Sequence, residues 1–165
     1  VLVDSKGIIS RGRNDLDSSK KELLDITNKN NLHGDLKAAL KGADIVLGLS
    51  QAGLLSSSDI QTMNTDAIVF AMANPVPEIL PEDAIAGGAK VVATGRSDYP
   101  NQINNVLVFP GMFKGAVQSG TTFITDEIKL KAAEKLASVV KSPSPEKIIP
   151  AVFDDGVVDA IVAAF

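Results

Sequence analysis

Residues 67–72 read Ala-Ile-Val-Phe-Ala-Met, a continuous apolar run with the length and composition of a strand buried on both faces. Two similar runs flank it, at 43–48 and 90–94. Polar segments with helix start signals separate the runs, such as Pro81 followed by two acids. Strands that alternate with helices at this spacing favour right-handed crossovers. We therefore predict an α/β fold with a doubly wound parallel sheet, in which the 43–48 strand is central.

The first part of the chain has shorter elements. Residues 1–4 form an apolar run that ends in an acid, so the chain opens inside a strand. Most domains begin with a few loosely held residues, and this start therefore indicates a piece of a longer polypeptide. The capping-box sequence of residues 19–22 predicts a short helix, and a second helix is expected at about 35–40.

The pattern changes after the third strand. A short apolar run at 106–109 is closed by a Pro-Gly pair, and 126–140 has the clearest helical periodicity. Two Ser-Pro pairs end this helix, and another apolar helical stretch covers 157–165. We interpret residues 1–141 as a dinucleotide-binding domain without its first strand and glycine-rich loop. Residues 142–165 form a tail and helix of the same parent protein.

Composition excludes several classes of function. The chain has 165 residues, of which 16 are Lys or Arg and 20 are Asp or Glu, so the net charge of −4 gives no basic field for nucleic acid. Without cysteine there is no disulfide framework, thiolate nucleophile or cysteine-based metal site. No apolar run approaches the ~20 residues that cross a bilayer. We expect a soluble cytoplasmic protein with no nucleic-acid or membrane partner.

Ligands of a doubly wound sheet bind beyond the carboxyl ends of its strands. Asp4 stands where such a fold places the acid that binds the adenosine ribose; the alternative is a solvated acid. Gly48 and Ser50 lie where backbone must approach a ligand closely, or else form an ordinary strand-to-helix turn. Asn74 precedes a proline, which holds its amide in extended geometry; the alternative is an Asx turn.

Four amides fall within residues 101–105, beside the apolar run at 106–109. Buried amides need partners, so this cluster is either a loop network that satisfies itself or a site that a ligand completes. His33, the only histidine, has no acid or nucleophile paired with it by pattern and is interpreted as a surface loop residue. Tyr99 lies between Asp98 and Pro100, which indicates a turn.

Several of these segments together resemble the NAD(P)-binding domain of bacterial-type malic enzymes. The most specific combination is Asn104-Asn105 followed by Phe109-Pro110-Gly111. The resemblance extends over nearly the whole chain, through residues 73–75, 93–102, 104–111, 126–133 and 148–150.

Malic enzymes decarboxylate malate oxidatively to pyruvate and carbon dioxide, with reduction of NAD or NADP and with Mg or Mn as metal. The resemblance implies that Asp4 binds the cofactor ribose and that Gly48 and Ser50 contact the dinucleotide. Asn74 and Asn104 would contact both cofactor and malate, and Asn105 would bind malate. We expect the intact enzyme to be a homodimer or a higher oligomer.

The family's phosphate loop, metal-binding carboxylates and catalytic Lys and Tyr have no counterpart in this chain. No residue here is therefore assigned a catalytic or metal-binding role, and we expect the chain alone to be inactive. Two alternatives remain: a non-catalytic nucleotide-binding or regulatory module, and the cofactor domain of another dehydrogenase. Asp4 favours NAD because a carboxylate repels a 2′-phosphate, although Lys6, Arg11 and Arg13 lie nearby.

Overall fold

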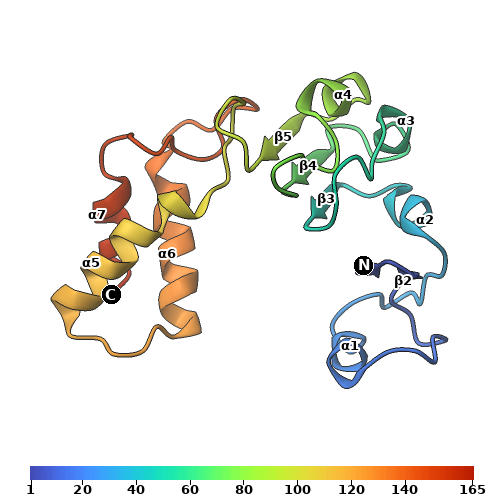
Figure 1. Ribbon diagram of the computed structural model, residues 1–165, viewed down its shortest axis with the longest axis horizontal. Helices are drawn as coiled ribbons and strands as arrows, with labels where there is room; N and C mark the ends of the chain where they lie inside the picture. The colour runs from blue at the N-terminus through green and yellow to red at the C-terminus, as the bar shows by residue number, and fades with distance from the viewer.

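Three parallel strands form the main sheet: β3 (Ile45–Gly48), β4 (Ile68–Ala71) and β5 (Val91–Thr94). The computed structural model describes all 165 residues, and the strands lie in the order β3-β4-β5 (Figure 1). The pairing is regular, with Ile68 opposite Ile45 on one side and Val91 on the other. The parallel α/β sheet that the sequence predicts is confirmed.

β4, not β3, is the central strand. Val69 and Ala71 of β4 are buried, whereas Ile45 and Leu47 of β3 each expose 57% of their surface. The prediction that the 43–48 strand is central is therefore wrong for this chain, because β3 is hydrogen-bonded to β4 along one edge only. An apolar strand signals burial in general and does not say which part of a protein buries it.

Short helices pack on the sheet and complete its core. They are α2 (Leu36–Leu40), α3 (Ser57–Ile60) and α4 (Pro81–Ala86). The core between them is aliphatic, as the scarcity of aromatic residues predicts; it includes Leu40, Ile60, Val69, Ala84 and Val92. A capping box of Ser56 and Asp59 begins α3.

The N-terminal segment folds beside the sheet and not within it. β1 (Val3–Asp4) pairs antiparallel with β2 (Gly7–Ile8), and α1 (Ser18–Leu23) follows. Its small core consists of Ile9, Leu16 and Leu24. Asp17, not Ser19, caps α1 by accepting a hydrogen bond from the main-chain nitrogen of Lys20 at 2.8 Å.

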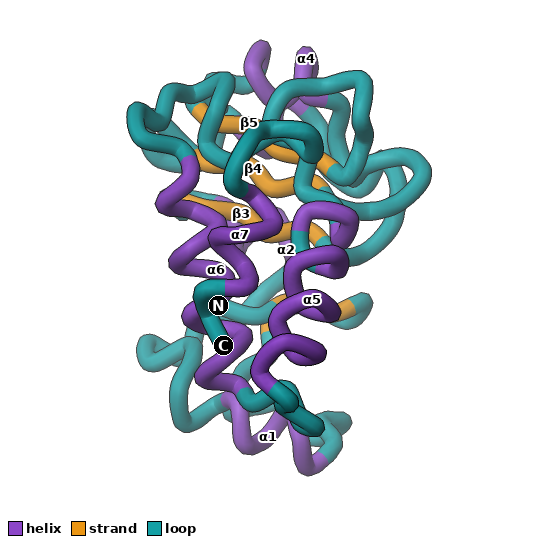
Figure 2. Tube along the Cα trace, turned by 90° about the vertical axis from the view of Figure 1, so that its left-hand side faces the viewer, coloured by secondary structure: helices purple, strands orange, loops and turns teal.

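The chain after the sheet forms a helical unit, residues 105–165. It contains a 3₁₀ turn (Asn105–Leu107), α5 (Phe109–Ser119), α6 (Asp126–Val139) and α7 (Val157–Val162). The helices α6 and α7 are confirmed close to their predicted bounds. α7 packs against both α5 and α6, and the three lie side by side in Figures 1 and 2. They share one core, so the division proposed between residues 141 and 142 crosses a packed unit and stays a prediction.

We did not predict α5, because Pro110 and Gly111 suggested that the apolar run ended in a turn. Pro110 lies in the first turn of α5, where its missing N–H costs nothing. Gly111 lets α7 approach, since a Cβ built there would lie 2.7 Å from Cγ2 of Ile161. None of the helices has both the length and the apolar character needed to span a bilayer.

Candidate functional site

The carboxyl ends of the three strands lead into loops at one edge of the sheet, residues 49–55, 72–79 and 95–104. In Figure 1, β4 and β5 point toward the side on which the helical unit lies. This carboxyl edge is where doubly wound sheets bind ligands. Four predicted site residues lie at the end of β3 or in these loops, namely Gly48, Ser50, Asn74 and Asn104, and a fifth, Asn105, begins the 3₁₀ turn directly after the last loop.

A buried carboxylate joins two of these loops. Glu78 is 0% exposed, and its Oε1 accepts a hydrogen bond from the main-chain nitrogen of Ser50 at 2.7 Å. Its Oε2 accepts one from the main-chain nitrogen of Ala73 at 2.9 Å. Gly48 lies directly against it, since a Cβ there would come within 2.6 Å of the Glu78 Cδ. Gly48 is thus a glycine because the carboxylate occupies the space of a side chain.

We did not predict a role for Glu78 from the sequence. It follows Pro77 in an otherwise apolar stretch, and a lone acid there is usually a solvated loop residue. The available signal was its position: a single charge among apolar neighbours, a few residues after a buried strand, must either reach solvent or find internal partners. The partners are main-chain groups of residues distant in sequence, which no local pattern reveals.

Asn74 presents a free amide at the carboxyl edge. It is exposed, its side chain makes no hydrogen bond to protein, and the peptide bond to Pro75 is cis. The alternative interpretation as an Asx turn is therefore not what the structure contains, since such a turn uses the side-chain oxygen. Ser50 is also exposed, and its hydroxyl makes no hydrogen bond to protein.

The amide cluster at 101–105 divides into two kinds of residue. Asn101 is buried, and its amide donates to the carbonyl oxygens of Val92 at 3.0 Å and Pro145 at 2.8 Å. Its Oδ1 accepts from the main-chain nitrogen of Ile148 at 2.8 Å. With a φ of 56°, it occupies the left-handed region that asparagine tolerates. Asn101 therefore fastens the tail to the end of the sheet, as a network that satisfies itself.

Asn104 and Asn105 are exposed. Asn104 Oδ1 accepts from the main-chain nitrogen of Val106 at 3.0 Å and so caps the 3₁₀ turn, which leaves its amino group without a protein partner. The Asn105 side chain makes no hydrogen bond to protein. The segments after β4 and β5 thus present two wholly free side-chain amides, Asn74 and Asn105, and the free amino group of Asn104.

Asp4 lies at the end of β1, in the small antiparallel sheet and not in the main sheet. Its Oδ1 accepts from Arg13 Nη1 at 2.7 Å and from the main-chain nitrogen of Lys6 at 3.0 Å. Its Oδ2 accepts from Arg13 Nη2 at 3.1 Å and from Lys20 Nζ at 2.9 Å. A carboxylate offers about four lone-pair sites, so these donors use its capacity.

The charged cluster around Asp4 is strongly ionised. Hydrogen bonds from Arg13, and then from Lys20, hold the pKa of the Asp4 carboxyl well below its usual range. The pKa of Asp15 is lowered in the same way by Arg13 and Lys6. Arg13 is bonded to both acids, and its pKa is raised. Asp4 is therefore a carboxylate at every physiological pH.

The two remaining candidates hold local structure. His33 is exposed, and its Nδ1 lies 3.1 Å from the Ser10 hydroxyl, in agreement with a surface loop residue. The ring of Tyr99 lies 5.4 Å from the Arg96 guanidinium, and its hydroxyl donates to Glu82 at 3.4 Å. Burial, and then the bond to Glu82, raise the pKa of Tyr99.

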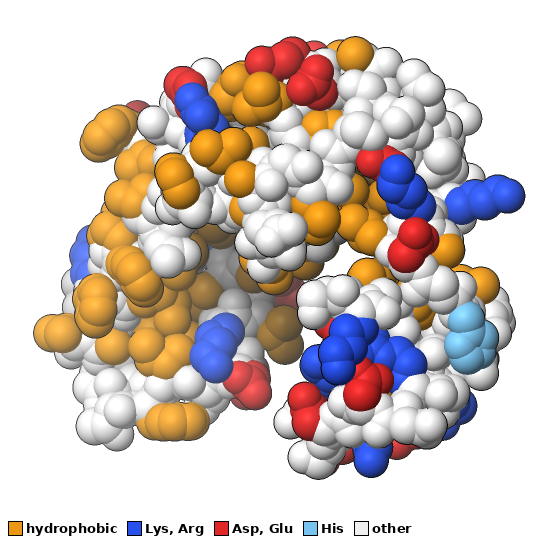
Figure 3. Space-filling model, turned by 45° about the vertical axis from the view of Figure 1, so that its right-hand side comes forward, with side chains coloured by type: hydrophobic (Ala, Val, Ile, Leu, Met, Phe, Trp, Pro, Cys, Tyr) orange, Lys and Arg blue, Asp and Glu red, His pale blue; other side chains and the backbone are white.

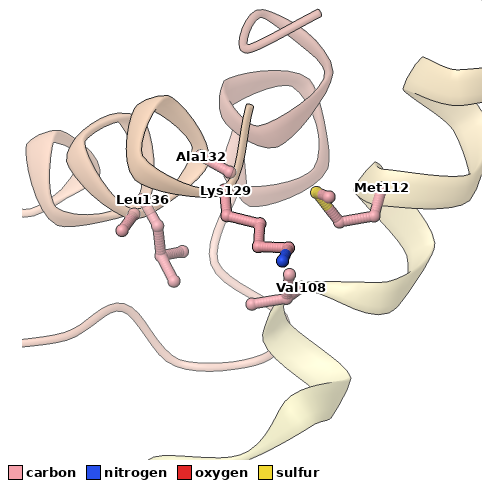
Figure 4. Close-up of a pocket in the computed structure, with 6 residues that line it drawn as sticks. Val108, Met112, Lys129, Ala132 and Leu136 are labelled. Carbon is pink, nitrogen blue, oxygen red and sulfur yellow. The ribbon is translucent and has the colours of Figure 1, made fainter. Parts of the chain in front are cut away.

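No group of three or more His, Cys, Asp or Glu side chains is arranged to hold a metal ion. A cavity of about 170 Å³ lies between α5 and α6, away from the carboxyl edge (Figure 4). Its lining is apolar except for Lys129, and comprises Val108, Met112, Lys129, Ala132, Ala133 and Leu136. Lys129 is its only charged group, and the Lys129 ammonium is already paired with Asp126 at 2.8 Å, so we assign no ligand to this gap in the helix packing.

Residues 1–163 match the family model described as malic enzyme, NAD binding domain. The chain belongs to the malic enzyme family. The resemblance carried by Asn104-Asn105 and Phe109-Pro110-Gly111 is thereby confirmed.

Two curated relatives illustrate the match. The bifunctional malic/malolactic enzyme of Bacillus subtilis is 48% identical over 99% of this chain and 41% of the relative. The NADP-dependent malic enzyme of Rhizobium meliloti is 40% identical over 99% of this chain and 23% of the relative. The chain thus spans less than half the length of these relatives. The family includes proteins named for NAD and for NADP.

Solved malic enzymes have the same fold. The NAD-dependent malic enzyme of Thermotoga maritima gives a TM-score of 0.90 at 46% identity, over 98% of this chain and 43% of that one. The malic enzyme of Entamoeba histolytica also gives 0.90, at 37% identity over 98% of this chain and 35% of that one. The strand order and the helical unit therefore form a Rossmann-like NAD-binding fold shared with these malic enzymes.

The two kinds of asparagine can be separated by stability. Asn101→Ala is expected to lower the free energy of unfolding by about 2–4 kcal/mol, because each buried group left without a partner costs about 1–3 kcal/mol. Asn105→Ala, the matched control, should change it by no more than about 0.5 kcal/mol. Urea unfolding followed by circular dichroism measures both. Equal losses for the two variants would mean that Asn101 does not fasten the tail.

Proposed function

We propose that this chain is the cofactor-domain portion of an enzyme that oxidatively decarboxylates malate to pyruvate and carbon dioxide while reducing NAD or NADP. The observation that carries the proposal is the pair of free amides, Asn74 and Asn105, in the segments that follow β4 and β5. A primary amide donates to a carboxylate and accepts from a hydroxyl, and malate offers both. Residues 1–141 would form the incomplete dinucleotide-binding domain and 142–165 its tail.

The loops after β3 and β4 suit a dinucleotide. The Ser50 hydroxyl has no protein partner and can bind ribose or phosphate, while Gly48 keeps the start of that loop free of side-chain bulk. Asn74 and the free amino group of Asn104 would orient the nicotinamide ribose and the substrate carboxylate. The cofactor, when bound, supplies the hydride acceptor, and the protein groups here bind and orient.

The remaining chemistry belongs to other parts of the parent enzyme. Decarboxylation needs a Lewis acid for the developing enolate oxygen and a group that transfers protons. The absence of a clustered ligand set means that these residues do not fit Mg or Mn by themselves. We propose that the ligands of that metal, and the acid and base, lie outside this chain, and that the chain alone is inactive.

Exposed apolar surfaces are consistent with a larger parent. Hydrophobic side chains gather over the helical unit in Figure 3, whereas charged side chains of both signs cover the N-terminal segment. On α5, Phe113 and Val117 expose 67% and 82% of their surface. The unpaired edge of β3 is a second such surface, where we place the missing first strand and its glycine-rich loop. A homodimer or higher oligomer would cover more of the helical unit.

An assay of the intact parent tests the proposed function. It should form NADH or NADPH in a malate-dependent reaction, detected by absorbance, with Mg or Mn present, and should lose this activity on metal chelation. Pyruvate and carbon dioxide should appear in equal amounts. No malate oxidation with either cofactor would favour the alternative, a non-catalytic nucleotide-binding or regulatory module.

Asn105 provides a test within this chain. In the intact parent, Asn105→Ala should raise the malate KM or lower kcat, with kcat/KM reduced about tenfold or more, because one hydrogen bond to a charged group contributes about 1.5–3 kcal/mol. Asn30→Ala is the matched control, since Asn30 is also exposed and makes no side-chain hydrogen bond. Wild-type kinetics for Asn105→Ala would remove this residue from the site.

Asp4 is proposed to bind the cofactor ribose and to favour NAD. Lys20 is the most exposed of its side-chain partners, so its ammonium can give way to ribose hydroxyls. Asp4→Ser in the intact parent should shift the ratio of kcat/KM values toward NADP about tenfold, because Arg13 and Lys20 would then face a 2′-phosphate without a competing carboxylate. Asp155→Ser, at an exposed acid with no ion pair, controls for overall charge. An unchanged ratio would exclude Asp4 from the ribose site.

A further inference from the structure

We propose that Glu78 is a positioning residue for the cofactor and substrate site, through main-chain hydrogen bonds that hold the loop after β3 against the loop after β4. The inference rests on the proposed function, because it concerns the same carboxyl edge. Glu78 itself is fully buried and cannot touch a ligand. It would act through Ser50, whose nitrogen it binds, and through Ala73, the residue before Asn74.

The contacts of the carboxylate are directed and few. Each oxygen accepts one main-chain N–H, at 2.7 and 2.9 Å, and no Lys, Arg or His lies within ion-pair distance. Burial of a carboxylate without a countercharge is costly, and an apolar side chain would fill the same space at lower cost. What the carboxylate adds is a fixed geometry. No strand pairing joins the loops after β3 and β4 at this point, and the Glu78 carboxylate holds them together.

The main chain of the same segment reinforces the connection. The nitrogen of Leu55 donates to the Glu78 carbonyl oxygen at 2.9 Å, and that of Gly53 donates to Pro77 at 3.1 Å. Gly48 leaves room for the Glu78 carboxylate, because a side chain at position 48 would overlap it. The β3 loop is therefore fixed to residues 77–78 at both of its ends, and only the Ser50 end depends on the side chain.

Glu78→Gln isolates this role. Glutamine keeps the size of the side chain, but its amide has one oxygen and one NH₂ group in place of two acceptors. The oxygen can accept from Ser50 or from Ala73, and the NH₂ group must then face the other N–H. One loop is released while the core keeps its shape.

The experiment uses the intact parent enzyme. Glu78→Gln should raise the Kd for NADH or NADPH, measured by nucleotide fluorescence, and the malate KM, each about tenfold, which corresponds to the loss of one charged hydrogen bond. The melting temperature is measured alongside. Ile79→Val is the control, because Ile79 is buried in the adjacent core and its truncation destabilises without touching the loops. If Ile79→Val lowers the melting temperature as much as Glu78→Gln does and also raises Kd and KM as much, the proposal is wrong. The proposal is also wrong if Glu78→Gln leaves Kd and KM unchanged.

A double-mutant cycle with Gly48→Ala tests the direct link. The added methyl group would displace the carboxylate, so Gly48→Ala should raise the cofactor Kd as Glu78→Gln does. If both act through the same hydrogen bonds, the double variant should show little more than the larger single effect. Effects that multiply would show that the two residues act independently, and would overturn the proposal.

The outcomes separate this inference from the proposed function. A wild-type parent that binds NADH but does not oxidise malate contradicts the proposed function, and the Kd of Glu78→Gln still decides the role of Glu78. A parent that oxidises malate equally well with and without the Glu78 carboxylate contradicts only the positioning role. A parent that binds neither NADH nor NADPH contradicts both.

Discussion

Two main-chain N–H groups donate to one buried carboxylate, and this arrangement connects two of the three loops at the carboxyl edge. Glu78 connects the nitrogen of Ser50 to that of Ala73, across loops that follow neighbouring parallel strands. Parallel strands define where their ends lie, but they do not define the path of the loops beyond. A side chain from one loop that bonds the main chain of the other adds that definition. The glycine at position 48 is a consequence, since the carboxylate fills its side-chain volume.

Much of the fold follows from local pattern. The three strands, α6 and α7 were predictable because periodicity and breakers act within a few residues. The position of β3 at an edge was not predictable, because its apolar sequence suits burial by any part of a protein. The α5 helix was missed for another reason: Phe109-Pro110-Gly111 suggests a turn locally, and only the approach of α7 explains why a helix needs Gly111.

In the candidate site, too, local sequence predicts some features, whereas others depend on residues distant in the chain. Asn74, Asn101 and Asn105 are alike in sequence terms, yet Asn101 is buried with three hydrogen bonds, one of them to a residue 47 positions away. Residue type and strand-end position predicted amides in the segments after the strands. They could not show which amides the protein itself satisfies. The hydrogen-bond donors of Asp4 were also not predictable from local sequence, since Arg13 and Lys20 lie 9 and 16 positions further along the chain.

Charge explains why these residues suit only part of a catalytic site. In the three loops of the carboxyl edge, Arg96 is the only basic residue, and it is bonded to Asp98 at 2.8 and 2.5 Å. Glu78 is an acid and is enclosed. The edge therefore offers hydrogen bonds without net positive charge.

Hydrogen bonds from neutral amides orient a dicarboxylate, but they do not compensate its two charges when water is displaced. In the proposed enzyme, compensation must come from cations held by other parts of the polypeptide, and a divalent metal supplies it together with the Lewis acidity that decarboxylation requires. Binding malate in the proposed enzyme thus requires both the neutral amides of this chain, which orient it, and positive charge outside this chain, which compensates its carboxylates.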